Sequence, residues 1–119
     1  MQYVTPFTSA ARTTTGNSGD LSNKQHRGLH LVIDATAATS TPSVVFTIQG
    51  KDPVSGQYYT ILASAAITGV STTVLRVYPA LTAAANATAN DVLPQTWRVL
   101  ATHGNANSLT YSVSACLIN

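Results

Sequence analysis

The sequence contains no glutamate and only two lysines, and charged residues make up 8% of its 119 positions. Helical proteins rely on Glu, Lys, Leu and Gln for their exposed faces, so this shortage argues against a helical bundle or an α/β enzyme. In their place the chain has 18 Thr, 17 Ala, 11 Ser and 11 Val. Threonine and valine favour strands, and serine favours turns. The composition therefore predicts an all-β protein, and the length predicts one domain.

Three further absences restrict the class of protein. Cys116 is the single cysteine, which excludes an intramolecular disulfide and a CxxC metal site. The first residues lack the charged and apolar regions of a secretory signal, and no apolar run is long enough to span a bilayer. We therefore expect synthesis in the cytoplasm and no membrane partner. The six basic residues are scattered along the chain, and we expect no nucleic-acid partner because phosphate binding needs clustered charge.

Alternating apolar and polar residues predict six strands. These are expected at 28–36, 43–49, 57–63, 72–78, 96–102 and 108–118. One more strand is possible in the N-terminal segment, and another near residues 62–70. The Ala-rich stretch 81–91 lacks an apolar stripe, so we expect a long loop with at most a short helix. Turn signals between the strands indicate two antiparallel sheets packed face to face, as a β-sandwich of the jelly-roll or immunoglobulin-like type.

The alternation also predicts which side chains face inward. The clearest case is the last strand, where Leu109, Tyr111, Val113, Ala115 and Leu117 share one face. Strands 43–49 and 57–63 should form a hairpin, because the intervening KDPVSG combines Pro, Asp and Gly in a turn. In that hairpin we expect one strand to direct Tyr59, Ile61 and Ala63 to the same side.

Residues 1–23 differ from the remainder in composition. They include the linker-like TTTGNSGDLSN, and their few large apolar residues, Tyr3, Val4 and Phe7, lie near the start. One interpretation is a frayed terminus. The other is an extended N-terminal arm, followed by a sandwich domain at 24–119, with Tyr3 and Phe7 anchored on a neighbouring subunit.

The ionisable residues form no arrangement typical of catalysis. His30 and Asp34 share a strand face but lie about 13 Å apart, too far for a direct pair. His26, His30 and His103 lack the spacing of a zinc site. Asp20 and Asp52 lie in turns, where we expect each carboxylate to accept a hydrogen bond from a nearby backbone amide and to have no catalytic role. We therefore predict a non-enzymatic protein with no catalytic residue, cofactor or metal.

Aromatic and arginine side chains are the candidates for contact with partners. Tyr58, Trp97 and Tyr111 are either stacking platforms for carbohydrate or part of the core. Arg76 and Arg98 should point outward, because their strand neighbours point inward. The predicted interface residues are Tyr3, Phe7, Arg12, Tyr58, Arg76 and Arg98.

Three stretches, IQGKDPVSGQYYTIL, VLPQTWRV and the terminal SLTYSVSA, give the chain a recognisable pattern over roughly residues 28–118. The pattern resembles the small β-sandwich virion proteins of tailed bacteriophages, the capsid decoration and related head-accessory proteins. The resemblance implies a non-enzymatic protein of the capsid exterior that binds the major capsid protein, often as a homotrimer. Two alternatives remain open from the sequence: a phage tail or neck component, and a carbohydrate-binding adhesion module.

Overall fold

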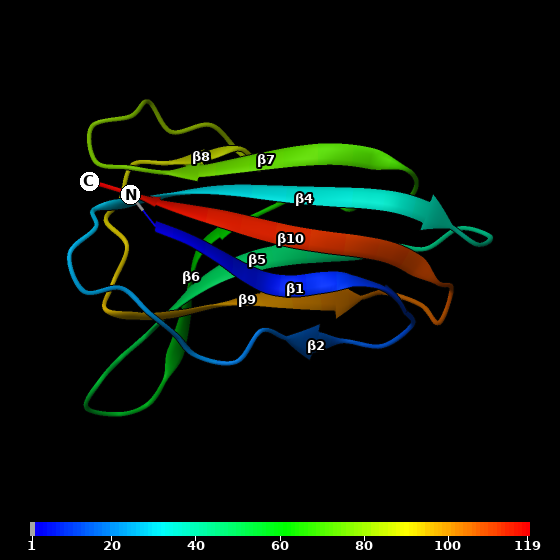
Figure 1. The fold of residues 1–119 in the computed structure, drawn as a ribbon, viewed down its shortest axis with the longest axis horizontal. Helices are drawn as coiled ribbons and strands as arrows, with labels where there is room; N and C mark the ends of the chain where they lie inside the picture. Colours follow the sequence, from blue (N-terminus) through cyan, green and yellow to red (C-terminus); the bar gives the residue numbers. More distant parts are fainter. Residues whose placement is uncertain (1) are drawn as a thin grey trace.

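The computed structural model describes residues 2–119, and their regular structure consists of ten β-strands (Figure 1). In chain order these are β1 (Gln2–Arg12), β2 (Gly16–Asn17), β3 (Leu21–Ser22), β4 (Gly28–Ala38), β5 (Val44–Lys51), β6 (Tyr58–Ala63), β7 (Ser71–Val77), β8 (Thr88–Ala89), β9 (Thr96–His103) and β10 (Leu109–Ile118). The six strands expected from the alternation are all present, with ends shifted by at most two residues. Residues 2–119 contain no helix that could cross a membrane.

The strands form two sheets, an arrangement compatible with a β-sandwich. Sheet A has the order β1-β10-β4-β7-β8, and sheet B has the order β2-β9-β5-β6, with β3 also paired to β9. All pairings are antiparallel except that of β7 with β8. The long strands of sheet A lie side by side in Figure 1, with both chain ends at the same end of the sheet. The prediction of an all-β fold is confirmed.

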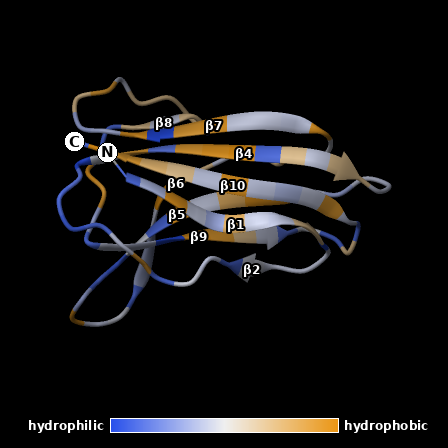
Figure 2. Ribbon diagram, in the orientation of Figure 1, coloured by the Kyte–Doolittle hydropathy of each residue, from blue (hydrophilic) through white to orange (hydrophobic). Residues whose placement is uncertain are grey.

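The core lies between the two sheets. The predicted inward face of β10 is confirmed, because all five residues of that face are at most 1% exposed. The alternating residues of β4 lie beside them in sheet A, and those of β5 and β9 face them from sheet B. The largest fully buried side chains are Trp97, Tyr111 and Phe46. The burial of each Leu-, Ile- or Phe-sized side chain stabilises the folded state by about 1.5–3 kcal/mol. This packing gives β4, β9 and β10 one buried and one outer face each, and residues of high and of low hydropathy occur along the same strand (Figure 2).

The β5–β6 hairpin has the predicted turn. The Asp52 carboxylate accepts a hydrogen bond from the Val54 amide, and Gly56 has a φ of 76°, which favours glycine. The expected faces of β6 are wrong, however, because a register shift opposite Ile48 and Gln49 leaves Ile61 as an extra residue. Leu62 faces the core, and Tyr59 is 46% exposed.

The N-terminal segment lies in the two sheets of its own chain. Strand β1 pairs with β10 from Gln2 opposite Leu117 to Arg12 opposite Leu109. Strands β2 and β3 pair with β9. The predicted separate arm at 1–23 is therefore not confirmed over residues 2–22, and Met1 lies outside the described residues.

Two other segments connect the long strands. The stretch 81–91 is mostly loop, with one turn in which the Thr88 amide donates to the Ala84 carbonyl, and its residues Thr88–Ala89 form β8, which pairs with the end of β7 at Arg76 and Val77. The stretch after β6 makes only an isolated bridge, Val44 with Ile67. Ser64 is the first residue after β6, and its side chain is buried. Its hydroxyl accepts a hydrogen bond from the Phe46 amide and donates one to the Ala65 carbonyl, which holds the chain in place where it leaves the strand.

Candidate interaction surfaces

The six predicted interface residues lie in three separate places. Phe7 and Arg12 are together at the bulged part of β1, and Tyr58 and Arg98 are together on the outer face of sheet B. The remaining two, Tyr3 and Arg76, belong to one row of residues that crosses the outer face of sheet A.

Phe7 belongs to the core of its own chain. It is 7% exposed, and its ring packs edge-on against Tyr111 with ring centroids 5.8 Å apart. The prediction that Phe7 anchors a neighbouring subunit is therefore wrong in this structure. The reason is that β1 pairs with β10, which turns Phe7 toward the space between the sheets.

Arg12 closes the irregular part of β1. The register of β1 shifts between Phe7 and Ala10, and the Arg12 guanidinium donates to the carbonyls of Thr8 (2.7 Å), Ala10 (3.3 Å) and Tyr111 (3.0 Å). The same group lies 4.7 Å from the Tyr111 ring centroid and 5.0 Å from that of Phe7. Arg12 thus supplies donors to carbonyls near the bulge and fixes β1 to β10.

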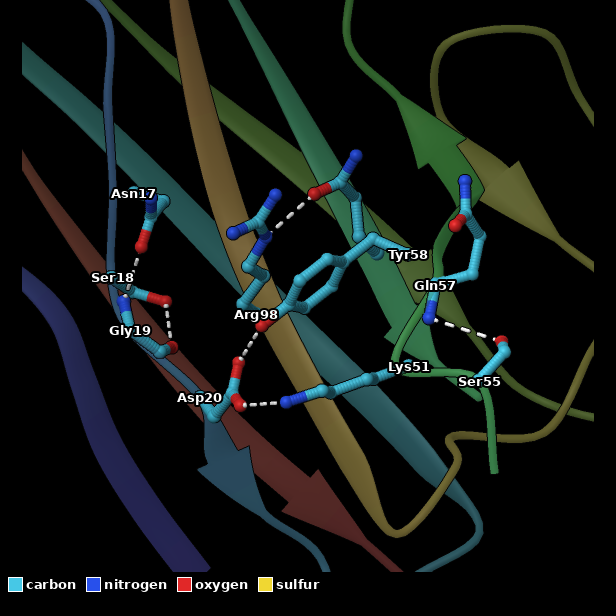
Figure 3. A network of polar contacts seen from close by, with 10 residues as sticks. Asn17, Ser18, Gly19, Asp20, Lys51, Ser55, Gln57, Tyr58 and Arg98 are labelled. Carbon is cyan, nitrogen blue, oxygen red and sulfur yellow. Dashed lines mark hydrogen bonds and ion pairs between the residues drawn. The ribbon is translucent and has the colours of Figure 1, made fainter. Parts of the chain in front are cut away.

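Tyr58 and Arg98 form the centre of a polar network on the outer face of sheet B (Figure 3). The Arg98 guanidinium stacks 3.5 Å from the Tyr58 ring centroid, and its Nε donates to Gln49 Oε1 at 2.7 Å. The Tyr58 hydroxyl donates to one Asp20 oxygen, and Lys51 Nζ donates to the other at 2.8 Å. The predicted outward direction of Arg98 agrees with this arrangement.

The network attaches the segment between β2 and β3 to sheet B. Hydrogen bonds from Lys51 and then Tyr58 lower the pKa of Asp20, and the Asp20 carboxylate raises the pKa of Lys51. The expectation that a turn bond accounts for Asp20 is wrong. The turn bond here is made by Asn17, whose side-chain oxygen accepts the Gly19 amide at 2.8 Å. Because the pair is solvent-exposed, its main effect is to orient these side chains.

The outer face of sheet A presents a nearly uncharged surface. One row across four strands consists of Tyr3, Cys116, His30 and Arg76. The next row consists of Ser114, Val32 and Val74, and the one after that of Ser112, Asp34 and Thr72. Tyr3 is 77% exposed, and the exposed Arg76 guanidinium makes no hydrogen bond or ion pair within residues 2–119. This face therefore combines two large exposed side chains with small polar and aliphatic ones.

The histidines lie apart from one another. His30 is opposite Arg76, whereas Asp34 is opposite Thr72, so the sheet keeps His30 and Asp34 in different rows. The buried His26 shares a hydrogen bond with Asn119, and His103 shares one with Tyr111. Within residues 2–119 no three His, Cys, Asp or Glu side chains are grouped closely enough to hold a metal ion.

The structure changes the candidates for stacking on carbohydrate. Trp97 and Tyr111 are fully buried, so the interpretation of these two as platforms is wrong. Tyr58 lies under Arg98. Tyr59, which is not among the predicted interface residues, is exposed beside a hollow at the β5–β6 turn. The signal that could have found it is Gly50, which faces Tyr59 across the predicted hairpin and leaves room for its ring.

The chain was compared with protein-family models, with curated proteins and with solved structures. None of these three comparisons finds a match.

Proposed function

We propose that this protein is a non-enzymatic structural protein of a tailed-phage virion that decorates and stabilises the outer surface of the capsid. Its partner in this proposal is the major capsid protein, and its sandwich is of the jelly-roll or immunoglobulin-like type. The observation on which the proposal depends most is the outer face of sheet A, with its row of Tyr3, Cys116, His30 and Arg76. The resemblance of the β5–β6 hairpin and the last strand to decoration proteins supports the same function.

The composition of this face suits contact with another protein. Protein interfaces are enriched in Tyr and Arg and depleted in Lys, Glu and Asp at their centres. In the three rows described above, Asp34 and Arg76 are the permanently charged side chains. Little desolvation of charge would therefore oppose association.

Multiplicity supports a role on an assembled shell. A capsid repeats the same surface many times, so a homotrimer would bind several copies at once and gain strength without new kinds of contact. Strand β1 is the edge of sheet A, and its free backbone groups could pair with an extended segment of a neighbour.

The proposal is tested by co-sedimentation with purified phage heads and by light scattering of the free protein. We expect binding at a stoichiometry comparable to the major capsid protein, and a trimeric mass in solution. Arg76→Glu should weaken binding, whereas Lys24→Glu, the same charge change in the loop before β4, should not. Recovery of the protein with tails instead would transfer the proposal to a tail or neck component. Binding to neither heads nor tails would overturn the virion function.

A further inference from the structure

A hollow of about 470 Å³ lies where the β5–β6 turn meets the segment before β9. Its lining includes Lys51, Asp52, Tyr59, Gln95 and Thr96, together with two prolines. The turn between β5 and β6 extends beyond sheet A, at the lower left of Figure 1. Sheet A therefore does not cover this end of sheet B, and the hollow is open to a ligand.

The far end of the Tyr59 ring lies close to the backbone of the neighbouring strand. Gly50 is its partner in the register, and a Cβ atom at Gly50 would lie 2.4 Å from Cζ of the ring. Only glycine leaves room for this close approach. The far end of the ring thus contacts the strand at Gly50, while the side chain as a whole remains 46% exposed. A ring that rests against a neighbouring strand loses less conformational freedom when a ligand stacks on it than a ring surrounded by solvent.

Polar groups surround the ring. The Asp52 carboxylate accepts hydrogen bonds from the Val54 amide and the Ser55 hydroxyl, and these lower its pKa, so it remains an ionised acceptor at neutral pH. The side chains of Gln95 and Thr96 make no hydrogen bond within residues 2–119 and are free to donate and accept. The Lys51 ammonium is already paired with Asp20, so the lining has no excess positive charge.

We propose that this hollow binds a neutral saccharide, with a pyranose ring stacked on Tyr59 and its hydroxyls hydrogen-bonded to Asp52, Gln95 and Thr96. A sugar has both an apolar C–H face for the ring and hydroxyls for the carboxylate and amide. A phosphate-bearing ligand would require net positive charge, and a purely apolar ligand would leave the carboxylate and amide unpaired. The site is separate from the outer face of sheet A and does not depend on the capsid-binding proposal.

The test is a titration of the ¹⁵N-labelled full-length protein with maltose, cellobiose, lactose and chitobiose, each to millimolar concentration, followed by NMR. We expect saturable shifts of the backbone amides of Tyr59, Gln95 and Thr96 with at least one of these sugars. Tyr59→Ala and Gln95→Ala should each raise the Kd by roughly tenfold or more. Tyr3→Ala, which removes the same side chain from sheet A, should leave the Kd unchanged.

Three results would overturn the proposal. The first is the absence of a saturable shift at these amides with every sugar of the panel. The second is a Tyr59→Ala variant that keeps native dispersion of its spectrum and binds as tightly as the wild type. The third is a change of the same amide shifts on dilution without sugar, since that would mean a second copy of the chain occupies the hollow.

Discussion

His103 and Tyr111 form a polar contact at the edge of the core. His103 Nε2 lies 3.1 Å from the Tyr111 hydroxyl, and Tyr111 is fully buried. His103 Nδ1 is buried and has no hydrogen-bond partner within residues 2–119. Burial and then the Arg12 charge lower the pKa of His103 from its ordinary value of 6.5. The folded state therefore favours the neutral imidazole.

This contact predicts a loss of stability in mild acid. Because the unfolded chain binds the proton more tightly, the contribution of His103 is fully present above about pH 6.5 and is lost as the pH falls toward the folded-state pKa. We expect the urea midpoint of the wild type to fall between about pH 7.5 and about pH 5.5 by more than that of His103→Gln. Equal falls in the two proteins would show that His103 does not carry this dependence.

At the scale of elements, a strained residue lies in the loop between β7 and β8. Ala80 has a φ of 72°, and its amide donates to Asn90 Oδ1 at 2.8 Å. An alanine in this left-handed region costs about 1–2 kcal/mol relative to its preferred conformations. The hydrogen bond to Asn90 helps to hold the loop in place despite that strain.

Ala80→Gly should therefore stabilise the protein by up to about 1 kcal/mol, since glycine adopts this φ without strain but loses more freedom on folding. The matched control is Ala83→Gly in the same exposed loop, where φ is not positive. That variant should be neutral or slightly destabilising. Chemical denaturation measures both, and a less stable Ala80→Gly would contradict the strain argument.

The elements also show what the sequence could and could not reveal. Strands β9 and β10 were predicted well because one face is buried along their whole length, which keeps the period of two visible. Strand β1 has two register shifts, so its buried positions do not alternate, and β2 and β3 have two residues each. The contact of Arg98 with Tyr58 depends on the pairing of β5 with both β9 and β6, which local sequence does not specify.

At the scale of the whole molecule, β1 decides whether the chain is a complete sandwich. It supplies Phe7 to the core, Val4 packs against that core, and β1 pairs with β10 along nearly all of its length. Without β1, strand β10 becomes an unprotected edge with apolar side chains beneath it. An external arm would instead be dispensable for folding. Deletion of β1 therefore distinguishes an integral strand of the fold from an external arm.

We expect deletion of residues 2–12 to abolish cooperative unfolding in urea and to cause association detectable by light scattering. A synthetic peptide of residues 2–12 should restore the native spectrum by pairing with β10. The same peptide with Phe7→Ala should bind far more weakly, because truncating a buried phenylalanine costs about 3–5 kcal/mol. A deletion variant that unfolds cooperatively with wild-type stability would instead favour the arm. In that case Phe7 would be free to anchor on a neighbouring subunit, as the sequence first suggested.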